Sequence, residues 1–134
     1  MTRLSPAQMV ATLLPNLNVP IEEAIPSRRG PIWAFSMPNP ETPYGILHLL
    51  DPNNPVKDLN GAALSLHEIA HCGRCQMGVP YYYPQDCITD EEQYEEEKKT
   101  NGFALLYAHI LGFSEEEMQQ VKEIFTKNLK TYEP

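Results

Sequence analysis

The sequence predicts a small α+β domain, in which a short antiparallel sheet packs on a central helix and a second helix, and a C-terminal helix follows. Ten of the 13 prolines fall within the first 55 residues, which favours short strands and loops there. The remainder carries helical periodicity and helix-start signatures. A chain of 134 residues supports one hydrophobic core but not two ordinary ones, so we expect a single domain over residues 1–134.

The N-terminal stretch "SPAQMVATLL" (5–14) predicts the first helix. Ser5 is a suitable N-cap, Pro6 suits the first helical position, and Gln8 completes a capping box. We expect this helix to end near Pro15.

Two apolar stretches in the proline-rich half predict strands. "PIWAFSM" (31–37) and "YGILHLL" (44–50) are rich in aromatic and branched residues and are bounded by turn-forming residues. Three prolines between them predict a loop, so the two strands are expected to form an antiparallel pair.

A central helix is predicted from Asn60 through "GAALSLHEIAHCG". Gly73 is expected to end it as a C-terminal cap. Residues 73–88 contain glycine, proline and tyrosine without a period and predict a loop.

Two further helices are predicted in the C-terminal third. Thr89 with Glu92 forms a capping-box pattern for a helix that ends at Gly112, and Ser114 with Glu117 begins the last helix. In the last helix, apolar residues repeat at helical spacing at Met118, Val121, Phe125 and Leu129.

The central helix carries the pattern "HEIAH". His67 and His71 are four residues apart, so a helix places both imidazoles on one face, where they can bind a common zinc ion. Glu68 lies beside that ion, at the position of a general base. The alternative is a chance pattern of surface polar residues. Apolar residues on the other faces disfavour it, because histidines on a buried helix need partners.

A third ligand is available downstream. Glu97 and Asn101 share a helix face, so Glu97 can complete a three-ligand site that leaves the fourth position open, as in catalytic zinc sites. Asn101 can accept a hydrogen bond from the far imidazole nitrogen of His67. Gly102 suggests close approach of the histidine helix. Alternatively, Glu97 is a solvated member of the acidic run 90–97.

The pattern "HEIAH", followed 26 residues later by "EKKTNGFA", resembles the gluzincin metallopeptidases, and among them the small ImmA/IrrE type. The resemblance covers residues 60–111 and implies a minimal zincin-like domain with a sheet packed on the active-site helix. It implies zinc ligands at His67, His71 and Glu97, a general base at Glu68 and a supporting role for Asn101.

Peptide-bond hydrolysis of a peptide or protein substrate is the expected reaction. Zinc would polarise the carbonyl and acidify a water molecule, and Glu68 would transfer the proton. The oxyanion also needs a hydrogen-bond donor, for which Tyr81, Tyr82, Tyr83 and His48 are candidates. Alternatively, the three tyrosines form a hydrophobic lid or partner surface, and His48 is a hydrogen-bonded histidine beside the core.

The three cysteines do not indicate a disulfide framework, because their number is odd. Reduced, packed thiols are the default expectation. The alternative is a second, structural metal site formed by Cys72, Cys75 and Cys87 with a histidine.

The formal net charge of −8 disfavours direct nucleic-acid binding, because an acidic surface repels phosphates. No apolar run approaches the length of a membrane span, so we expect no membrane insertion and a cytoplasmic location.

Two other functions compete with the peptidase. One is a non-catalytic, zinc-stabilised module that binds a protein through its acidic face and the loop Tyr81–Tyr83. The other is regulation by occlusion, in which the C-terminal helix or tail covers the cleft.

Overall fold

A computed structural model gives the backbone of residues 4–17, 21–23, 34–36, 46–49, 58–76 and 89–133, and places the side chains of 4–17, 58–74 and 89–133. The helices, in chain order, are α1 (Pro6–Leu13), the 3₁₀ turn η1 (Leu14–Asn16), α2 (Leu59–Gln76), α3 (Asp90–Leu111), α4 (Glu115–Leu129) and the 3₁₀ turn η2 (Lys130–Tyr132). The strands are β1 (Ile21–Glu23), β2 (Ala34–Ser36) and β3 (Ile46–Leu49).

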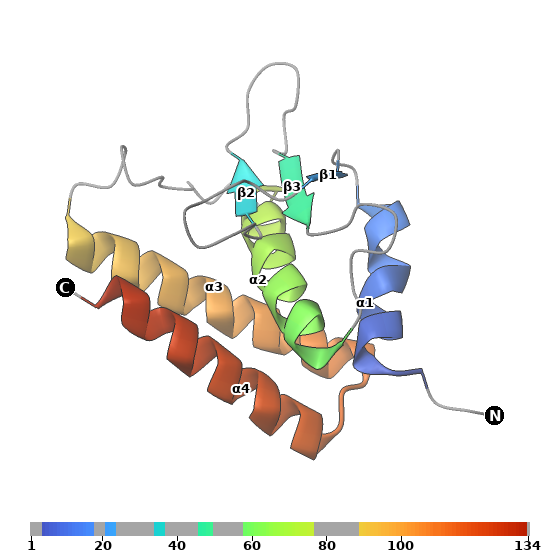
Figure 1. The fold of residues 1–134 in the computed structure, drawn as a ribbon. Coiled ribbons are helices and arrows are strands. Elements are labelled where there is room, and N and C mark those ends of the chain that lie inside the picture. The colour runs from blue at the N-terminus through green and yellow to red at the C-terminus, as the bar shows by residue number, and fades with distance from the viewer. Residues whose placement is uncertain are drawn as a thin grey trace.

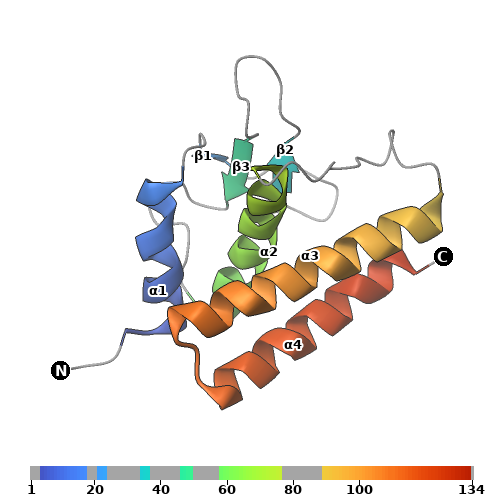
Figure 2. The ribbon, with the colours of Figure 1, turned by 180° about the vertical axis from the view of Figure 1, so that it is seen from behind.

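The helices are arranged around α2. Helices α3 and α4 lie side by side and run in opposite directions, and α2 crosses them (Figure 1). Helix α1 packs along α2, away from most of α3 and α4, as the reverse view also shows (Figure 2). Helix α2 therefore contacts all three other α-helices and is the central element of the fold.

Two predicted capping boxes are confirmed. The Ser5 hydroxyl accepts from the Gln8 amide at 3.2 Å, and the Gln8 side chain accepts from the Ser5 amide at 2.8 Å. At the start of α4, the corresponding distances between Ser114 and Glu117 are 3.1 and 2.8 Å. Each box satisfies two amides that the first helical turn leaves without partners, so the sequence defines both helix starts locally.

Helix α3 begins and ends as predicted, with one difference in its cap. The Thr89 hydroxyl accepts from the Glu92 amide at 3.1 Å, but it also lies 3.2 Å from the Glu92 carboxylate, to which it donates. At the other end, Gly112 has φ 100°. This left-handed conformation is unfavourable for residues with a Cβ, and it ends the helix.

The prediction that Gly73 ends the central helix is wrong, and so is the prediction of a close approach at Gly102. Helix α2 continues to Gln76. A Cβ on Gly73 would overlap the Tyr107 hydroxyl on α3, whereas a Cβ on Gly102 would meet nothing within 4 Å. The glycine that permits close helix packing is therefore Gly73. A glycine is needed there because Tyr107 of α3 lies close, and not because the chain turns.

The predicted α+β fold class is wrong, because the described architecture is helical. Helices make up 88% of the part of the chain with placed side chains, and that part holds no strand. The three short strands pair in the order β1–β3–β2, with β1 parallel and β2 antiparallel to β3, so the sheet is mixed and not antiparallel. Among the residues whose burial is described, the core forms between helices.

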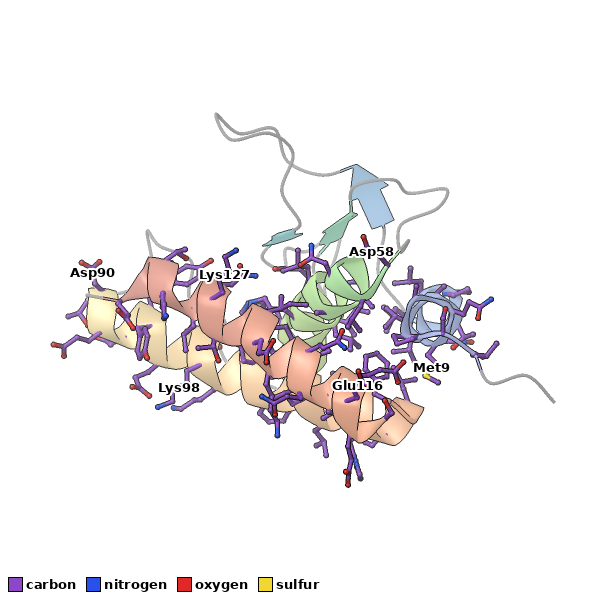
Figure 3. The ribbon with its side chains drawn as sticks, turned by 60° about the horizontal axis from the view of Figure 1, so that its bottom comes forward. Met9, Asp58, Asp90, Lys98, Glu116 and Lys127 are labelled. Atoms are coloured by element: carbon purple, nitrogen blue, oxygen red, sulfur yellow. The ribbon has the colours of Figure 1, made fainter. Side chains whose placement is uncertain are left out.

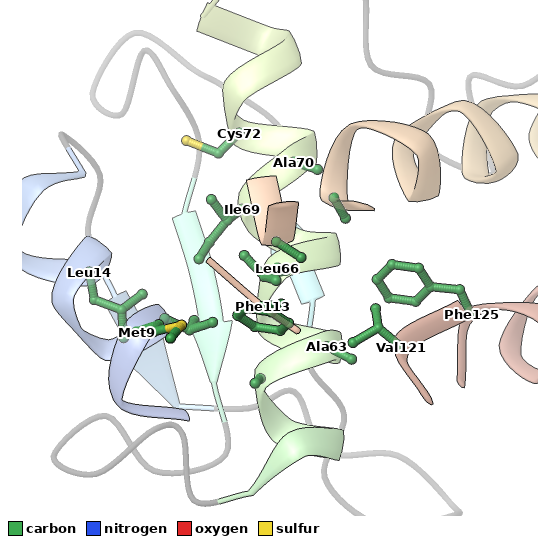
Figure 4. Close-up of a cluster of buried hydrophobic side chains, with 14 residues drawn as sticks. Met9, Leu14, Ala63, Leu66, Ile69, Ala70, Cys72, Phe113, Val121 and Phe125 are labelled. Carbon is green, nitrogen blue, oxygen red and sulfur yellow. The ribbon is translucent and has the colours of Figure 1, made fainter. Parts of the chain in front are cut away.

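The core lies around α2, where apolar faces of the helices meet (Figure 4). Val121 and Phe125 of α4 are 0% and 3% exposed, and burying each stabilises the fold by about 1.5–3 kcal/mol. Helix α4 is thus part of the core. Other core side chains are Met9, Leu14, Leu66, Ile69, Ala70 and Phe113.

Charged side chains occupy the outer faces of the two long helices. Lys98 on α3 and Glu116 and Lys127 on α4 are exposed and lie on the outside of the molecule (Figure 3). Within the described part of the chain, no helix combines the length and apolarity needed to cross a membrane.

Candidate metal centre

Three side chains from α2 and α3 converge at the interface between these helices. His67 Nε2 lies 2.7 Å from Glu97 Oε2, and His71 Nε2 lies 3.4 Å from the same oxygen. The two imidazole rings are perpendicular, with centroids 4.8 Å apart. One ligand atom from each residue lies within 4.8 Å of the others, so the group is close enough to hold a metal ion.

The donor set fits zinc. Zinc bonds of about 2.1 Å in tetrahedral geometry place ligand atoms roughly 3.4 Å apart. His71 Nε2 lies at this spacing from Glu97 Oε2, 3.4 Å, whereas His67 Nε2 lies closer, at the hydrogen-bond distance of 2.7 Å. Two imidazole nitrogens and one carboxylate oxygen form a three-ligand set of a kind that zinc accepts, and these three are the ligand atoms found among the described residues.

Asn101 contacts His67 on the side away from Glu97. Asn101 Oδ1 lies 2.7 Å from His67 Nδ1, and because an amide oxygen only accepts, the ring donates its Nδ1 proton. The predicted contact between Asn101 and His67 is therefore present. It directs the Nε2 atom of His67 toward Glu97, which is the orientation that metal binding needs.

The centre attracts positive charge. Burial disfavours a charged His67, but the hydrogen bond to Glu97 and the charges of Glu68 and Glu97 outweigh it and raise the pKa of His67 from 6.5 to about 9. Burial also opposes a charged Glu97, yet hydrogen bonds from His67 and His71 lower the pKa of Glu97 from 4.5 to about 2. Without a metal, a proton on His67 supplies the cation between the ligand atoms.

Glu68 lies beside the three converging residues and outside their group. Its Oε1 atom is 4.0 Å from His67 Nε2, and its side chain is 13% exposed. Glu68 lines a cavity of about 340 Å³ together with His67 and Glu97. A carboxylate at this position can reach a water molecule or substrate without belonging to the ligand set.

The C-terminal segment forms one wall of the cavity. Phe125 is buried there and its ring centroid lies 6.1 Å from that of His67. Residues lining this wall, in addition to Phe125, are Asn128, Leu129, Thr131 and Tyr132. Because α4 also belongs to the core, the wall is part of the folded structure.

Tyr132 at this wall has no recognisable signal in the sequence. Burial first, and then the negative charges of Glu97 and Glu68, raise the pKa of the Tyr132 phenol. The phenol therefore keeps its proton and remains a hydrogen-bond donor near the two carboxylates. Only the course of η2 beside α3 brings Tyr132 to the site.

Several residues predicted to act at the site have no described side chain. The loop with Tyr81, Tyr82, Tyr83 and Cys87 lies outside the described residues. Only the backbone of His48, in β3, and of Cys75, in α2, is described. Cys72 is 1% exposed and belongs to the hydrophobic core. The predicted donor tyrosines and second metal site remain predictions.

Comparisons with known proteins give no relative: no protein-family model, curated protein or solved structure matches the chain.

Proposed function

We propose that the protein is a zinc-dependent peptidase whose metal ligands are His67, His71 and Glu97. The proposal depends mainly on one observation: two imidazole nitrogens and a carboxylate oxygen converge beside a cavity that also contains Glu68. A purely structural zinc site is normally closed by four protein ligands, whereas the described residues supply three. The resemblance of "HEIAH" and "EKKTNGFA" to gluzincins supports the same assignment.

Glu68 is the general base in this proposal. A zinc ion at the centre would supply a Lewis acid for the substrate carbonyl and lower the pKa of a water molecule. In this role the Glu68 carboxylate would accept a proton from the attacking water and pass it to the leaving amine. Its side chain is 13% exposed and lines the cavity, where it is accessible to a water molecule and a substrate.

Tyr132 is the described phenol that faces the substrate cavity. Its hydroxyl is a candidate hydrogen-bond donor to the developing oxyanion, in addition to the candidates Tyr81–Tyr83 and His48. A cavity of about 340 Å³ is within the size range of small-ligand pockets, which suits one or two residues of a peptide around the scissile bond.

Metal content and one substitution test the proposal. Protein purified without added metal is expected to contain one equivalent of zinc by mass spectrometry. Glu68→Gln should keep the zinc and lower hydrolysis of a peptide library about 10²–10⁴-fold, because the base is lost. Glu95→Gln is the matched control, since Glu95 is an exposed carboxylate on α3.

The outcomes separate the peptidase from a binding module. Wild-type protein without zinc contradicts the metal centre itself. Zinc binding with equal peptide hydrolysis in wild type and Glu68→Gln contradicts catalysis by Glu68. In that case a zinc-stabilised protein-binding module becomes the better explanation, because such a module does not need an unligated carboxylate beside the metal.

A further inference from the structure

A buried polar cluster lies behind His71. Arg74 on α2 is 6% exposed, and Glu96 and Thr100 on α3 are 8% and 0% exposed. Charged residues are seldom buried unless they are paired. The cluster occupies the α2–α3 interface on the side of His71 that faces away from Glu97.

Arg74 holds the cluster together. Its Nη1 atom donates to Glu96 Oε1 at 2.5 Å and to Thr100 Oγ1 at 3.0 Å. A longer contact of 3.4 Å reaches the Glu96 carbonyl oxygen. Thr100 in turn lies 3.3 Å from His71 Nδ1, so the cluster extends to the ring of the metal-site histidine.

The hydroxyl proton of Thr100 decides the direction of the bond to His71. The Thr100 hydroxyl lies 2.9 Å from the Glu96 carbonyl oxygen, which can only accept, so the hydroxyl proton is used there. Arg74 can only donate to the hydroxyl oxygen. With its proton on the nearer Glu96 carbonyl, at 2.9 Å against 3.3 Å to His71 Nδ1, the hydroxyl oxygen accepts from His71, which then carries a proton on Nδ1.

From this arrangement we infer that Thr100, held by Arg74 and Glu96, is a positioning residue that keeps the Nε2 lone pair of His71 directed at the metal centre. The inference rests on the proposed metal centre. The opposite neutral tautomer would point an Nε2 proton at the metal and place a bare Nδ1 against the Thr100 oxygen. Hydrogen bonds of this kind fix the tautomer and orientation of metal-binding histidines.

Stability alone gives a poor account of the cluster. Buried ion pairs are often replaceable by apolar residues without loss, because desolvation offsets their attraction. Arg74 Nε is buried and has no hydrogen-bond partner among the described residues. A pair with this unsatisfied atom, directly behind a metal-site histidine, is better explained by orientation of His71.

Substitutions at Thr100 test the inference through zinc affinity, measured by competition with a chromophoric chelator. Thr100→Val keeps the shape but removes the hydroxyl, and is expected to raise the zinc dissociation constant about 10–100-fold. Thr100→Ser should restore wild-type affinity. Thr126→Val is the matched control, because the Thr126 hydroxyl also donates to the carbonyl oxygen four residues earlier, at 2.8 Å, on an exposed helix face.

A measurement on the wild-type protein requires no variant to fold. In imidazole ¹H–¹⁵N spectra of the zinc-loaded protein, His71 should carry its proton on Nδ1, protected from exchange by Thr100. A proton on Nε2 of His71 would overturn the inference. Unchanged zinc affinity in folded Thr100→Val would overturn it as well, while leaving the proposed function intact. A wild-type chain that binds no zinc overturns both.

Discussion

The two histidines of the metal centre lie on the same helix but in different surroundings. The His67 side chain is 15% exposed and lines the cavity with Glu68, whereas the His71 side chain is 2% exposed. Asn101 accepts from His67, and Thr100 accepts from His71. The centre thus has an open side at His67 and a closed side at His71.

In the proposed zinc site, the two sides would have different roles. The closed side fixes one ligand through a buried hydrogen-bond network, which limits its movement. The open side leaves space for substrate and places Glu68 next to it. We therefore expect substitutions on the closed side to affect stability and metal affinity, and those on the open side to affect chemistry.

The largest effect is expected from His71→Ala on the closed side. Loss of one of three ligands should lower the zinc content from about one equivalent to near zero, because the remaining two donors bind weakly. Mass spectrometry of the purified protein measures this directly. His109→Ala, an exposed histidine on α3, should keep its zinc. Equal zinc contents in the two variants would falsify the assigned ligand set.

Removal of Arg74 tests the energetic role of the closed side. Arg74→Met leaves Glu96 buried without its cation and should lower the free energy of unfolding by about 3–5 kcal/mol. Urea unfolding of zinc-free protein measures the change. Lys98→Met, at an exposed position, should change it by about 0.5 kcal/mol or less. The double variant Arg74→Met/Glu96→Met should recover much of the free energy of unfolding that Arg74→Met loses. An equal loss in the single and the double variant would contradict a role for the ion pair.

The stability of the zinc-free chain should depend on pH through His67 and Glu97. The pKa of His67 is raised from 6.5 to about 9. The protonated ring therefore adds its full contribution to the free energy of unfolding below pH 6.5, and this contribution is lost as pH rises through 9. The pKa of Glu97 is lowered from 4.5 to about 2, so its contribution is complete above pH 4.5 and is lost as pH falls through 2.

Urea titration of the zinc-free chain at different pH values measures this dependence. The contribution of His67 and Glu97 to the free energy of unfolding should be greatest between pH 4.5 and 6.5. His67→Gln should remove the decline between pH 6.5 and 9. A wild-type profile that coincides with that of His67→Gln would contradict the proposed charge state of the pair.

The smallest effects are expected from the two helical glycines. Gly102→Ala should stabilise the protein by about 1 kcal/mol, since its Cβ meets nothing within 4 Å. Gly73→Ala, next to the closed side, should destabilise it by about 1–3 kcal/mol because Tyr107 must move. Thermal unfolding distinguishes the two signs, and stabilisation by Gly73→Ala would show that Tyr107 yields easily.

Local features of the sequence predicted most helix boundaries. The capping boxes at Ser5 and Ser114 and the C-terminal Gly112 act within one helical turn, so their effect does not depend on the rest of the fold. The end of α2 was predicted wrongly because Gly73 leaves room for Tyr107 and does not cap the helix. A single sequence cannot distinguish a glycine needed for packing from one that ends a helix.

The fold class was not predicted correctly, since short apolar stretches such as 31–37 and 44–50 do not reveal which element forms the core. Each contains a strand of only three or four residues. The apolar sides of α1, α3 and α4 instead pack on α2, and α3 also packs on α4. Which faces are buried together is a property of the whole chain.

The sequence by itself determined that His67 and His71 share one helix face, and that Glu97 and Asn101 share another, because the helical period of 3.6 residues fixes both pairs. Only the tertiary structure decided how these faces meet. It brought Glu97 to the histidines, Thr100 to His71 and Arg74, and Tyr132 to the cavity. These contacts join residues far apart in the chain, and the packing of α2, α3 and α4 sets their distances.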